Sequence, residues 1–327
     1  MVPQALRVIF IGGAGRSGST VLDRVLGRVD GFVSLGEVNH IWERGFVENQ
    51  LCGCGKPLKA CAFWCAVIEE AFGSNGWGNE SAFLELQRSV ARLRHLPSLL
   101  FPAVRSHRFS ANLNRYITLL GCFYRAIAKI SGCNTLIDSS KLPPHGFILS
   151  EIPGMEVSVI HLVRDSRAVA YSWQRRKVRP EIYWKESYMR RRGCVETVYE
   201  WMLCNLFIEV LSRKVERYTI MQYEQFAQFP KEEIARLLTW AGAKAPLDFF
   251  MDERTVDLGI AHTVSGNPSR FEHGTVKIRP DRAWSKEMPF EKKYVVSGVT
   301  FPLLMRYYKK GRPGKERNAD ASQIHIR

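Results

Sequence analysis

Eight residues near the start of the chain have the types and spacing of an anion-binding loop. The stretch GAGRSGST spans residues 13–20 and follows the apolar run Val8–Ile11, and apolar residues at helical spacing come next, over residues 21–29. The backbone N–H groups of such a turn, together with the positive end of a helix dipole, bind phosphate or sulfate. The sequence therefore predicts an anion site here. A tight strand-to-helix turn without a ligand is the alternative.

This loop has the G-x4-G-x-[ST] spacing of a Walker loop, but it lacks the lysine. Gly13 and Gly18 fit the spacing, and Ser19 stands where a nucleoside triphosphatase has its lysine. The positive charge lies inside the loop instead, on Arg16. The loop therefore argues against ordinary ATP chemistry and favours another anionic nucleotide.

A second candidate anion site follows the apolar run Val157–Val163. Arg164 comes directly after this run, and Ser172 stands eight residues later. A helix between them would return the serine to the same side, so both could donate to one phosphate, for which a guanidinium is a planar, two-pronged donor. The alternative is an arginine that caps the sheet edge with an aspartate partner.

Five short apolar runs rich in β-branched or aromatic residues predict the strands that must position these groups. Helical patterns follow several of the runs, which is typical of a parallel sheet covered by helices. We expect an α/β fold, with a P-loop-like three-layer α/β/α arrangement and a central parallel sheet of about five strands. The runs are Val8–Ile11, Phe32–Leu35, Thr135–Asp138, Val157–Val163 and Tyr218–Met221.

The chain of 327 residues predicts one domain over residues 1–310 and a basic, disordered tail over residues 311–327. A helical, cysteine-containing insertion over residues 44–132 interrupts the alternation of strands and helices. We expect it to cover the carboxyl edge of the sheet and to shape an acceptor pocket. A purely structural helical layer is the alternative.

Four cysteines of this insertion lie within 14 residues and have the spacing C-x-C-x6-C-x3-C. Ordinary thiols that stabilise a loop, a disulfide and a zinc site are the three interpretations left open. The spacing lacks the paired C-x2-C units typical of structural zinc sites, and a reducing compartment disfavours a disulfide. The four are Cys52, Cys54, Cys61 and Cys65.

The net charge of +15 favours polyanionic ligands, among them a nucleotide with several phosphates, nucleic acid or an anionic membrane surface. The basic runs at 175–177 and 190–192 come with no nucleic-acid-binding motif, so we expect no nucleic-acid partner. The segment 175–192 suits an anionic acceptor or a peripheral membrane contact, with plain surface as the alternative. No apolar run is long enough for a membrane helix or a signal peptide, and we expect a cytoplasmic protein.

Taken in this order along the chain, the motifs resemble those of sulfotransferases that use 3′-phosphoadenosine 5′-phosphosulfate. In that family an R/K-S-G-[ST]-T loop holds the 5′-phosphosulfate, and a strand-end arginine and a serine eight residues on hold the 3′-phosphate. Tyr223-Glu224 resembles the Tyr-Glu near the nucleotide base, and the resemblance covers roughly residues 6–285. The donor-binding residues implied are Gly15, Arg16, Ser17, Gly18, Ser19, Thr20, Arg164, Ser172, Tyr223, Asn267 and Arg270.

The resemblance is closer to the tyrosylprotein and carbohydrate branches and to related bacterial enzymes than to the phenol type. Glu37 stands where the tyrosylprotein branch has a catalytic glutamate, although that branch has two adjacent glutamates and here Val38 follows. An ionised carboxylate can accept the proton of an attacking hydroxyl. The resemblance therefore implies Glu37 as the catalytic base, and a surface loop residue is the alternative.

The same branch has a lysine-containing segment that matches residues 138–141, which implies that Lys141 and Arg16 stabilise charge during transfer. Basic side chains would take the place of a metal ion, so no metal is required. Residues 262–270 resemble a late segment of bacterial members, in which Asn267 and Arg270 could close over the 3′-phosphate. Loop and turn chemistry alone also explains Gly266-Asn267-Pro268.

The activity implied is in-line transfer of a sulfuryl group to the hydroxyl of a small molecule, glycan or lipid. The alternative enzyme is a P-loop kinase or NTPase acting on a small molecule. It would need a lysine in the loop, which is missing, and an acidic residue for magnesium, for which Asp138 could serve. A basic nucleic-acid-binding protein is the third interpretation, and the oligomeric state stays open.

Overall fold

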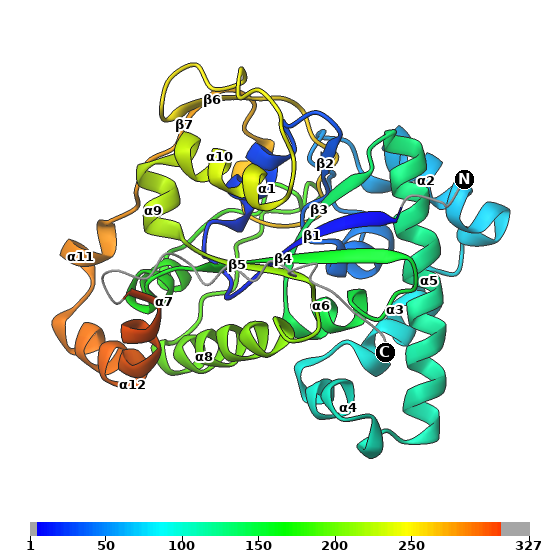
Figure 1. Cartoon of the computed structure of the whole chain (residues 1–327), viewed down its shortest axis with the longest axis horizontal. Helices are drawn as coiled ribbons and strands as arrows, with labels where there is room; N and C mark the ends of the chain where they lie inside the picture. The colour runs from blue at the N-terminus through cyan, green and yellow to red at the C-terminus, as the bar shows by residue number, and fades with distance from the viewer. Residues whose placement is uncertain (1–4, 309–327) are drawn as a thin grey trace, which may run out of the picture.

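The computed structural model describes residues 5–308 of the chain, and a five-stranded parallel sheet forms its centre (Figure 1). The strand order is β2-β3-β1-β4-β5, and every pair of neighbours is parallel. Each strand overlaps one of the five predicted runs, so the predicted α/β class and the parallel sheet are confirmed. The bounds are β1 (Leu6–Gly12), β2 (Phe32–Ser34), β3 (Thr135–Lys141), β4 (Met155–Val163) and β5 (Arg217–Gln222).

The central strand β1 shows why the runs are continuously apolar. Val8 and Phe10 point into the core on one face of the sheet, and Ile9 and Ile11 point into a separate core on the other face. Because side chains alternate between the two faces, a strand covered on both sides needs apolar residues at every position.

Helices cover both faces of the sheet (Figure 1). On one face lie α1 (Ser19–Leu26), α9 (Tyr223–Gln228) and α10 (Pro230–Trp240). On the other face lie α5 (His107–Ser131), α6 (Pro143–Leu149) and α8 (Cys194–Leu211). The predicted three-layer α/β/α arrangement is therefore present.

The predicted insertion over residues 44–132 mainly thickens one of these layers. Its helices α2 (Ala62–Phe72) and α3 (Glu80–Val90) pack against α5, and α4 (Leu96–Leu100) lies against α6. This part forms a helical layer. The stretch before α2 instead contacts residues 262–265, near the carboxyl edge of the sheet.

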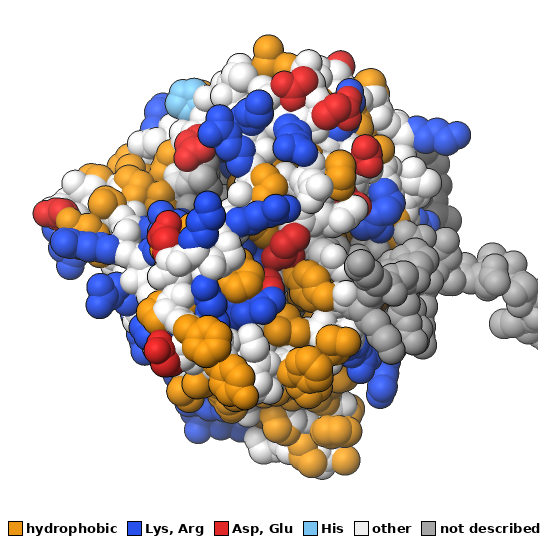
Figure 2. All heavy atoms as spheres, turned by 90° about the vertical axis from the view of Figure 1, so that its left-hand side faces the viewer, with side chains coloured by type: hydrophobic (Ala, Val, Ile, Leu, Met, Phe, Trp, Pro, Cys, Tyr) orange, Lys and Arg blue, Asp and Glu red, His pale blue; other side chains and the backbone are white. Residues whose placement is uncertain are grey.

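Three helices close one side of the molecule, namely α7 (Ser166–Gln174), α11 (Ala283–Glu287) and α12 (Phe290–Tyr308). Figure 2 shows this side, and hydrophobic side chains gather on its lower part, where α12 exposes Phe290 and Tyr294. No helix within residues 5–308 is long and apolar enough to cross a membrane. The predicted basic tail, residues 311–327, lies outside the described residues.

A small antiparallel sheet of β6 (Thr255–Leu258) and β7 (Gly274–Lys277) was not predicted. It packs beside α1, and the long connection between its two strands includes residues 262–270. This small sheet therefore delivers the late segment of the chain to the region of the predicted site.

Candidate active site

The predicted site residues follow the carboxyl ends of the five strands. Because parallel strands end at the same edge of a sheet, these residues meet in one region of the molecule. The anion-binding loop follows β1, and the other residues in strand order along the chain are Glu37 after β2, Lys141 at the end of β3, Arg164 after β4 and Tyr223 after β5.

The loop after β1 depends on two glycines that no other residue could replace without strain. Gly13 has a φ of 138° and a Cβ there would lie 2.4 Å from the carbonyl oxygen of Leu162. Gly18 has a φ of 88°, directly precedes α1, and a Cβ there would lie 2.4 Å from the Tyr223 ring. The hydroxyl of Ser17 is buried without a hydrogen-bond partner in this structure. An unsatisfied donor beside a helix start fits a bound phosphate or sulfate.

Several cationic side chains surround the loop. The guanidinium groups of Arg16 and Arg192 both lie over the Trp173 ring, 4.7 and 4.2 Å from its centroid. Burial lowers the pKa of Arg16. The negative charge of Glu37 raises this pKa, and the positive charges of Arg192 and Arg164 lower it further. The pKa of Lys177 is lowered first by burial and then by Arg16. Like charges crowded in this way favour an anion between them.

Arg164 connects the loop to the strand end of β5. One terminal nitrogen donates to the backbone carbonyl of Arg16 at 3.0 Å, and the other contacts a carboxylate oxygen of Asp281 at 3.0 Å. Its guanidinium also lies over the Tyr223 ring, 4.4 Å from the centroid. The aspartate partner of the alternative interpretation is thus present, and the arginine still borders the loop.

Ser172 lies in α7, next to Trp173 in the chain. It is buried, with 5% of the residue exposed. A Cβ on Gly15 would approach the Trp173 ring to 3.0 Å, so α7 packs directly against the loop.

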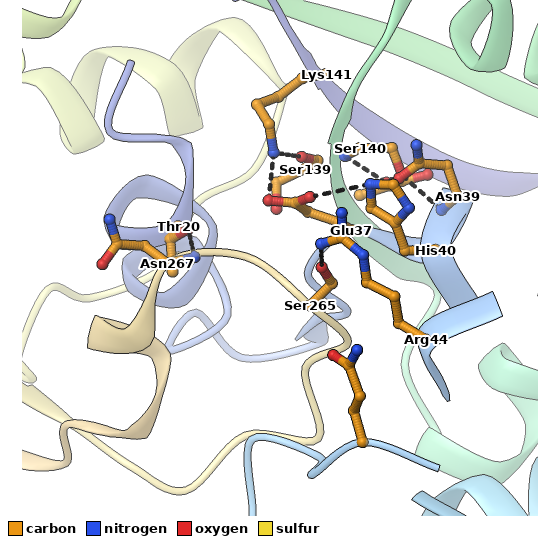
Figure 3. A network of polar contacts seen from close by, with 12 residues as sticks. Thr20, Glu37, Asn39, His40, Arg44, Ser139, Ser140, Lys141, Ser265 and Asn267 are labelled. Atoms are coloured by element: carbon orange, nitrogen blue, oxygen red, sulfur yellow. Dashed lines mark hydrogen bonds and ion pairs between the residues drawn. The ribbon is translucent and has the colours of Figure 1, made fainter. Parts of the chain in front are cut away.

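Glu37 forms a short ion pair with Lys141 (Figure 3). The carboxylate oxygen and the ammonium nitrogen are 2.6 Å apart, and both side chains are nearly buried, with 13% and 12% exposed. The Nε2 atom of His40 lies 3.6 Å from the second carboxylate oxygen. Glu37 is therefore not a surface loop residue.

The environment of Glu37 keeps it ionised. Burial alone would raise its pKa, but the charge of Lys141, and then His40 and Arg44, lower the pKa to about 2. Burial lowers the pKa of His40 to about 3, so this imidazole is neutral at neutral pH. Glu37 is thus an anion held by one strong cationic partner.

A buried network fixes the turn that carries Lys141. Both carboxylate oxygens of Asp138 are occupied: one accepts from the Ser140 backbone at 2.8 Å, and the other accepts from Tyr124 at 2.5 Å and contacts His145 at 2.8 Å. Lys141 then takes a φ of 66° at the strand end. Asp138 is fully buried and already satisfied, so its geometry does not suit the magnesium ligand of a kinase.

The late segment 262–270 lies beside this pair. The Asn267 backbone N–H donates to the Thr20 hydroxyl at 3.2 Å, and the Ser265 hydroxyl accepts from Arg44 at 2.6 Å (Figure 3). A Cβ on Gly266 would lie 3.2 Å from Thr20 and 3.5 Å from the Glu37 carboxylate. The loop and the carboxylate therefore flank the same glycine.

Arg270 of the late segment is almost completely buried. Only 1% of it is exposed, and its guanidinium donates to the backbone carbonyls of Thr263 and Leu51, each at 2.6 Å. Burial lowers its pKa to about 10. In this structure Arg270 joins the cysteine loop to the late segment, and its Nε atom is buried without a hydrogen-bond partner among the described residues.

A family model described as the sulfotransferase family matches residues 8–246. This chain belongs to the sulfotransferase family. The matched residues include the loop, Glu37, Lys141, Arg164 and Tyr223, and the match ends before the late segment 262–270.

Three solved structures are similar to this sulfotransferase at low identity. The sulfotransferase domain of the Synechococcus PCC 7002 olefin synthase is 20% identical with a TM-score of 0.48, covering 90% of this chain and 94% of that one. The sulfotransferase domain from the curacin biosynthetic pathway is 15% identical with a TM-score of 0.47, covering 90% and 96%. Sulfotransferase STF9 from Mycobacterium avium is 13% identical with a TM-score of 0.46, covering 94% and 78%. No protein with a curated description matches the chain.

Several residues that line the site of this sulfotransferase were not predicted from the sequence. His40 and Arg44 stand three and seven positions after Glu37, a spacing typical of one helical face. The backbone there is a 3₁₀ turn followed by a π-helix over Ile41–Val47, which the apolar pattern does not indicate. Lys177 and Arg192 belong to the basic segment that was noted without a specific role.

Proposed function

We propose that this protein transfers the sulfuryl group of 3′-phosphoadenosine 5′-phosphosulfate to a hydroxyl group, with Glu37 as the general base. The observation that carries the proposal is the Glu37–Lys141 pair, which lies across Gly266 from the anion-binding loop. Such a transfer requires a carboxylate, an ammonium group and an anion-binding loop, and all three lie at the carboxyl edge of the sheet.

The donor would extend along the carboxyl edge of the sheet. Gly15, Ser17, Gly18, Ser19 and Thr20, with the start of α1, would hold the 5′-phosphosulfate. The 3′-phosphate would bind Arg164 and Ser172, with Tyr223 near the base and Asn267 over the loop. The buried, unpartnered Ser17 hydroxyl and the crowded cations support this arrangement. Arg270 would approach the 3′-phosphate from the late segment; its two terminal nitrogens bind backbone carbonyls, and its Nε atom is buried without a partner among the described residues.

In the reaction, the acceptor oxygen attacks sulfur and its proton passes to Glu37. The bond between sulfur and the bridging oxygen breaks, and its electron pair stays on the 5′-phosphate of the leaving nucleotide. Arg16 and Lys141 stabilise the charge that develops there, which is the role that magnesium has in kinases. No metal ion takes part in this scheme.

Lys141 has two tasks in this scheme. While it pairs with Glu37 it holds the pKa of the carboxyl at about 2, which makes Glu37 a weak base. When the ammonium turns toward the sulfonate, the pKa of Glu37 rises because burial is then less compensated. Binding of the donor would therefore strengthen the base.

The acceptor would be a hydroxyl of a small molecule, glycan or lipid, and we expect the reaction in the cytoplasm without a nucleic-acid partner. Lys177 and Arg192 account for part of the basic segment 175–192. Its exposed arginines remain for an anionic acceptor or a peripheral membrane contact; they are Arg175, Arg176, Arg190 and Arg191. Mass spectrometry of cell extracts incubated with isotope-labelled donor would identify the labelled product.

Calorimetric titration with adenosine 3′,5′-bisphosphate and with AMP tests the donor site. We expect the bisphosphate to bind more tightly, and Arg164→Ala to weaken the bisphosphate about 10- to 100-fold, since a charged hydrogen bond contributes about 1.5–3 kcal/mol. AMP affinity should change little. Arg167→Ala is the matched control, because Arg167 lies three residues later, in the first turn of α7, and pairs with Asp165. Equal affinity of the wild type for both nucleotides would contradict the donor assignment, and magnesium-dependent ATP turnover would favour a kinase.

A further inference from the structure

Three cysteines of the insertion meet a histidine from the distant late segment. The Sγ atoms of Cys52, Cys54 and Cys61 and a ring nitrogen of His262 all lie within 4.8 Å of one another. His262 is 201 positions away from Cys61 in the chain. Cys65, the fourth cysteine of the sequence cluster, is not part of this group.

Three of the six distances between these atoms are close to those of a tetrahedron around one ion. The Sγ atoms of Cys54 and Cys61 are 3.7 Å apart, and the Nδ1 atom of His262 lies 3.2 Å from Cys61 Sγ and 3.9 Å from Cys52 Sγ. A tetrahedral zinc ion with bonds of about 2.3 Å to sulfur and about 2.0 Å to nitrogen separates two sulfurs by about 3.8 Å and sulfur from nitrogen by about 3.5 Å. A disulfide needs about 2.0 Å between its sulfurs, and all eight cysteines are unpaired thiols here.

The surrounding residues hold the four side chains in place. The His262 ring stacks on Phe63 at 4.9 Å, with 13° between the ring planes. A Cβ on Gly53 would lie 2.3 Å from the Thr263 hydroxyl oxygen, so only glycine lets the cysteine loop approach the late segment this closely. Gly55, with a φ of 83°, allows the turn in which its N–H donates to the Cys52 carbonyl. This turn brings Cys52 and Cys54 to the same side.

We propose that Cys52, Cys54, Cys61 and His262 bind one zinc ion as a closed structural site. Three thiolates and an imidazole are ligands that zinc prefers and that calcium and magnesium do not. Four protein ligands fill the tetrahedron and leave no open position for a substrate, so the ion stabilises structure. Binding displaces the thiol protons into solvent, and no electron transfer is involved.

The zinc ion would connect the cysteine loop to the segment that positions Glu37. The Val264 carbonyl accepts from the Glu37 backbone N–H at 2.7 Å, two residues after His262. Ser265 accepts from Arg44, which also belongs to the insertion. Zinc binding does not rest on the proposed transfer reaction, but loss of zinc is expected to loosen the segment beside the catalytic base.

Elemental analysis of the purified full chain by mass spectrometry tests the site. We expect one zinc ion per chain in the wild type and in Cys65→Ser, which removes a neighbouring thiol whose partner is the Lys59 carbonyl. Cys54→Ser and His262→Ala should bind zinc at least about tenfold more weakly, since loss of even an outer partner of a ligand costs about 10- to 100-fold in affinity, and should contain less zinc after dialysis. Equal zinc content in all four proteins would overturn the assignment of the ligands.

Measurements on the wild type keep the test valid if a ligand variant does not fold. Replacement of zinc by cobalt should give the visible absorption of a tetrahedral thiolate site, and a chelator should lower the melting temperature. A wild-type chain without metal would overturn the proposal, whether thiol titration then finds eight reactive thiols or fewer because of a disulfide. Iron in place of zinc would also overturn the choice of ion.

Discussion

Glu37 and Lys141 approach each other where solvent hardly reaches either side chain. Each charge offsets the unfavourable burial of the other, so removal of one leaves an uncompensated charge in the interior. The sequence predicted both residues through the resemblance, but their contact depends on a strand order, β2-β3, that no local pattern reveals. His40 and Arg44 were not predicted beside them, because the 3₁₀ turn and the π-helix that carry them have no distinct apolar pattern.

Protonation of Glu37 predicts a specific acid sensitivity. Its pKa is about 2 in the folded protein against an ordinary value of 4.5. The stabilisation is therefore present above about pH 4.5 and is lost as the pH falls toward 2, for a total of about 3 kcal/mol in the free energy of unfolding. Melting temperatures from pH 6 down to pH 3.5 should fall more steeply for the wild type than for Glu37→Gln.

Glu85→Gln, in which an exposed glutamate of α3 is changed, is the control for this measurement. It should follow the wild-type curve at every pH. Parallel curves for the wild type and Glu37→Gln would contradict the assigned protonation behaviour of Glu37.

Some elements of the fold could be predicted from the sequence pattern, and others could not. The five central strands are buried on both faces, and such strands give the continuous apolar runs from which they were predicted. The four-residue strands β6 and β7 are too short for a clear alternation. Helix α2 is apolar on nearly every side because it packs within the insertion, so its sequence shows no distinct face.

Gly18, which directly precedes α1, provides a test of whether the anion-binding loop binds the nucleotide. Gly18→Ala should lower the affinity for adenosine 3′,5′-bisphosphate at least about tenfold, because the new methyl group meets the Tyr223 ring at 2.4 Å and displaces it or the loop. Calorimetric titration measures the loss. Gly154→Ala is the control, since Gly154 also has a positive φ, of 74°, but has open space at its Cβ.

Both variants should lose a similar amount of stability from backbone strain, about 1–2 kcal/mol. Only Gly18→Ala should lose affinity. An unchanged affinity in Gly18→Ala would show that the loop does not contact the nucleotide.

Across the whole molecule, the net charge of +15 is concentrated in part where the donor is proposed to bind. Arg16 follows β1, Arg164 follows β4, and Lys177 and Arg192 lie in the connection between α7 and α8, so only the folded chain brings the four together. The sequence could predict the excess of basic residues, but not which of them face one site.

This crowding of cations predicts a strong salt dependence of nucleotide binding. Affinity for adenosine 3′,5′-bisphosphate should fall about tenfold between low salt and about 0.5 M salt, because ions screen the attraction to its phosphates. Adenosine, which carries no charge, is the matched ligand and should bind with nearly constant affinity. The same salt dependence for both ligands in titration calorimetry would contradict a cationic phosphate site.

The Glu37–Lys141 ion pair at the carboxyl edge of the sheet also has a consequence for the order in which the two substrates bind. An acceptor that enters first meets a carboxylate already neutralised by its lysine, which takes no proton from a hydroxyl. A nucleotide that enters first attracts the ammonium group to its sulfonate, and the carboxylate can then accept the proton of the acceptor hydroxyl. Initial-rate kinetics should accordingly follow a compulsory sequence with the nucleotide first, and the enzyme would rest in an idle state whenever the nucleotide is scarce.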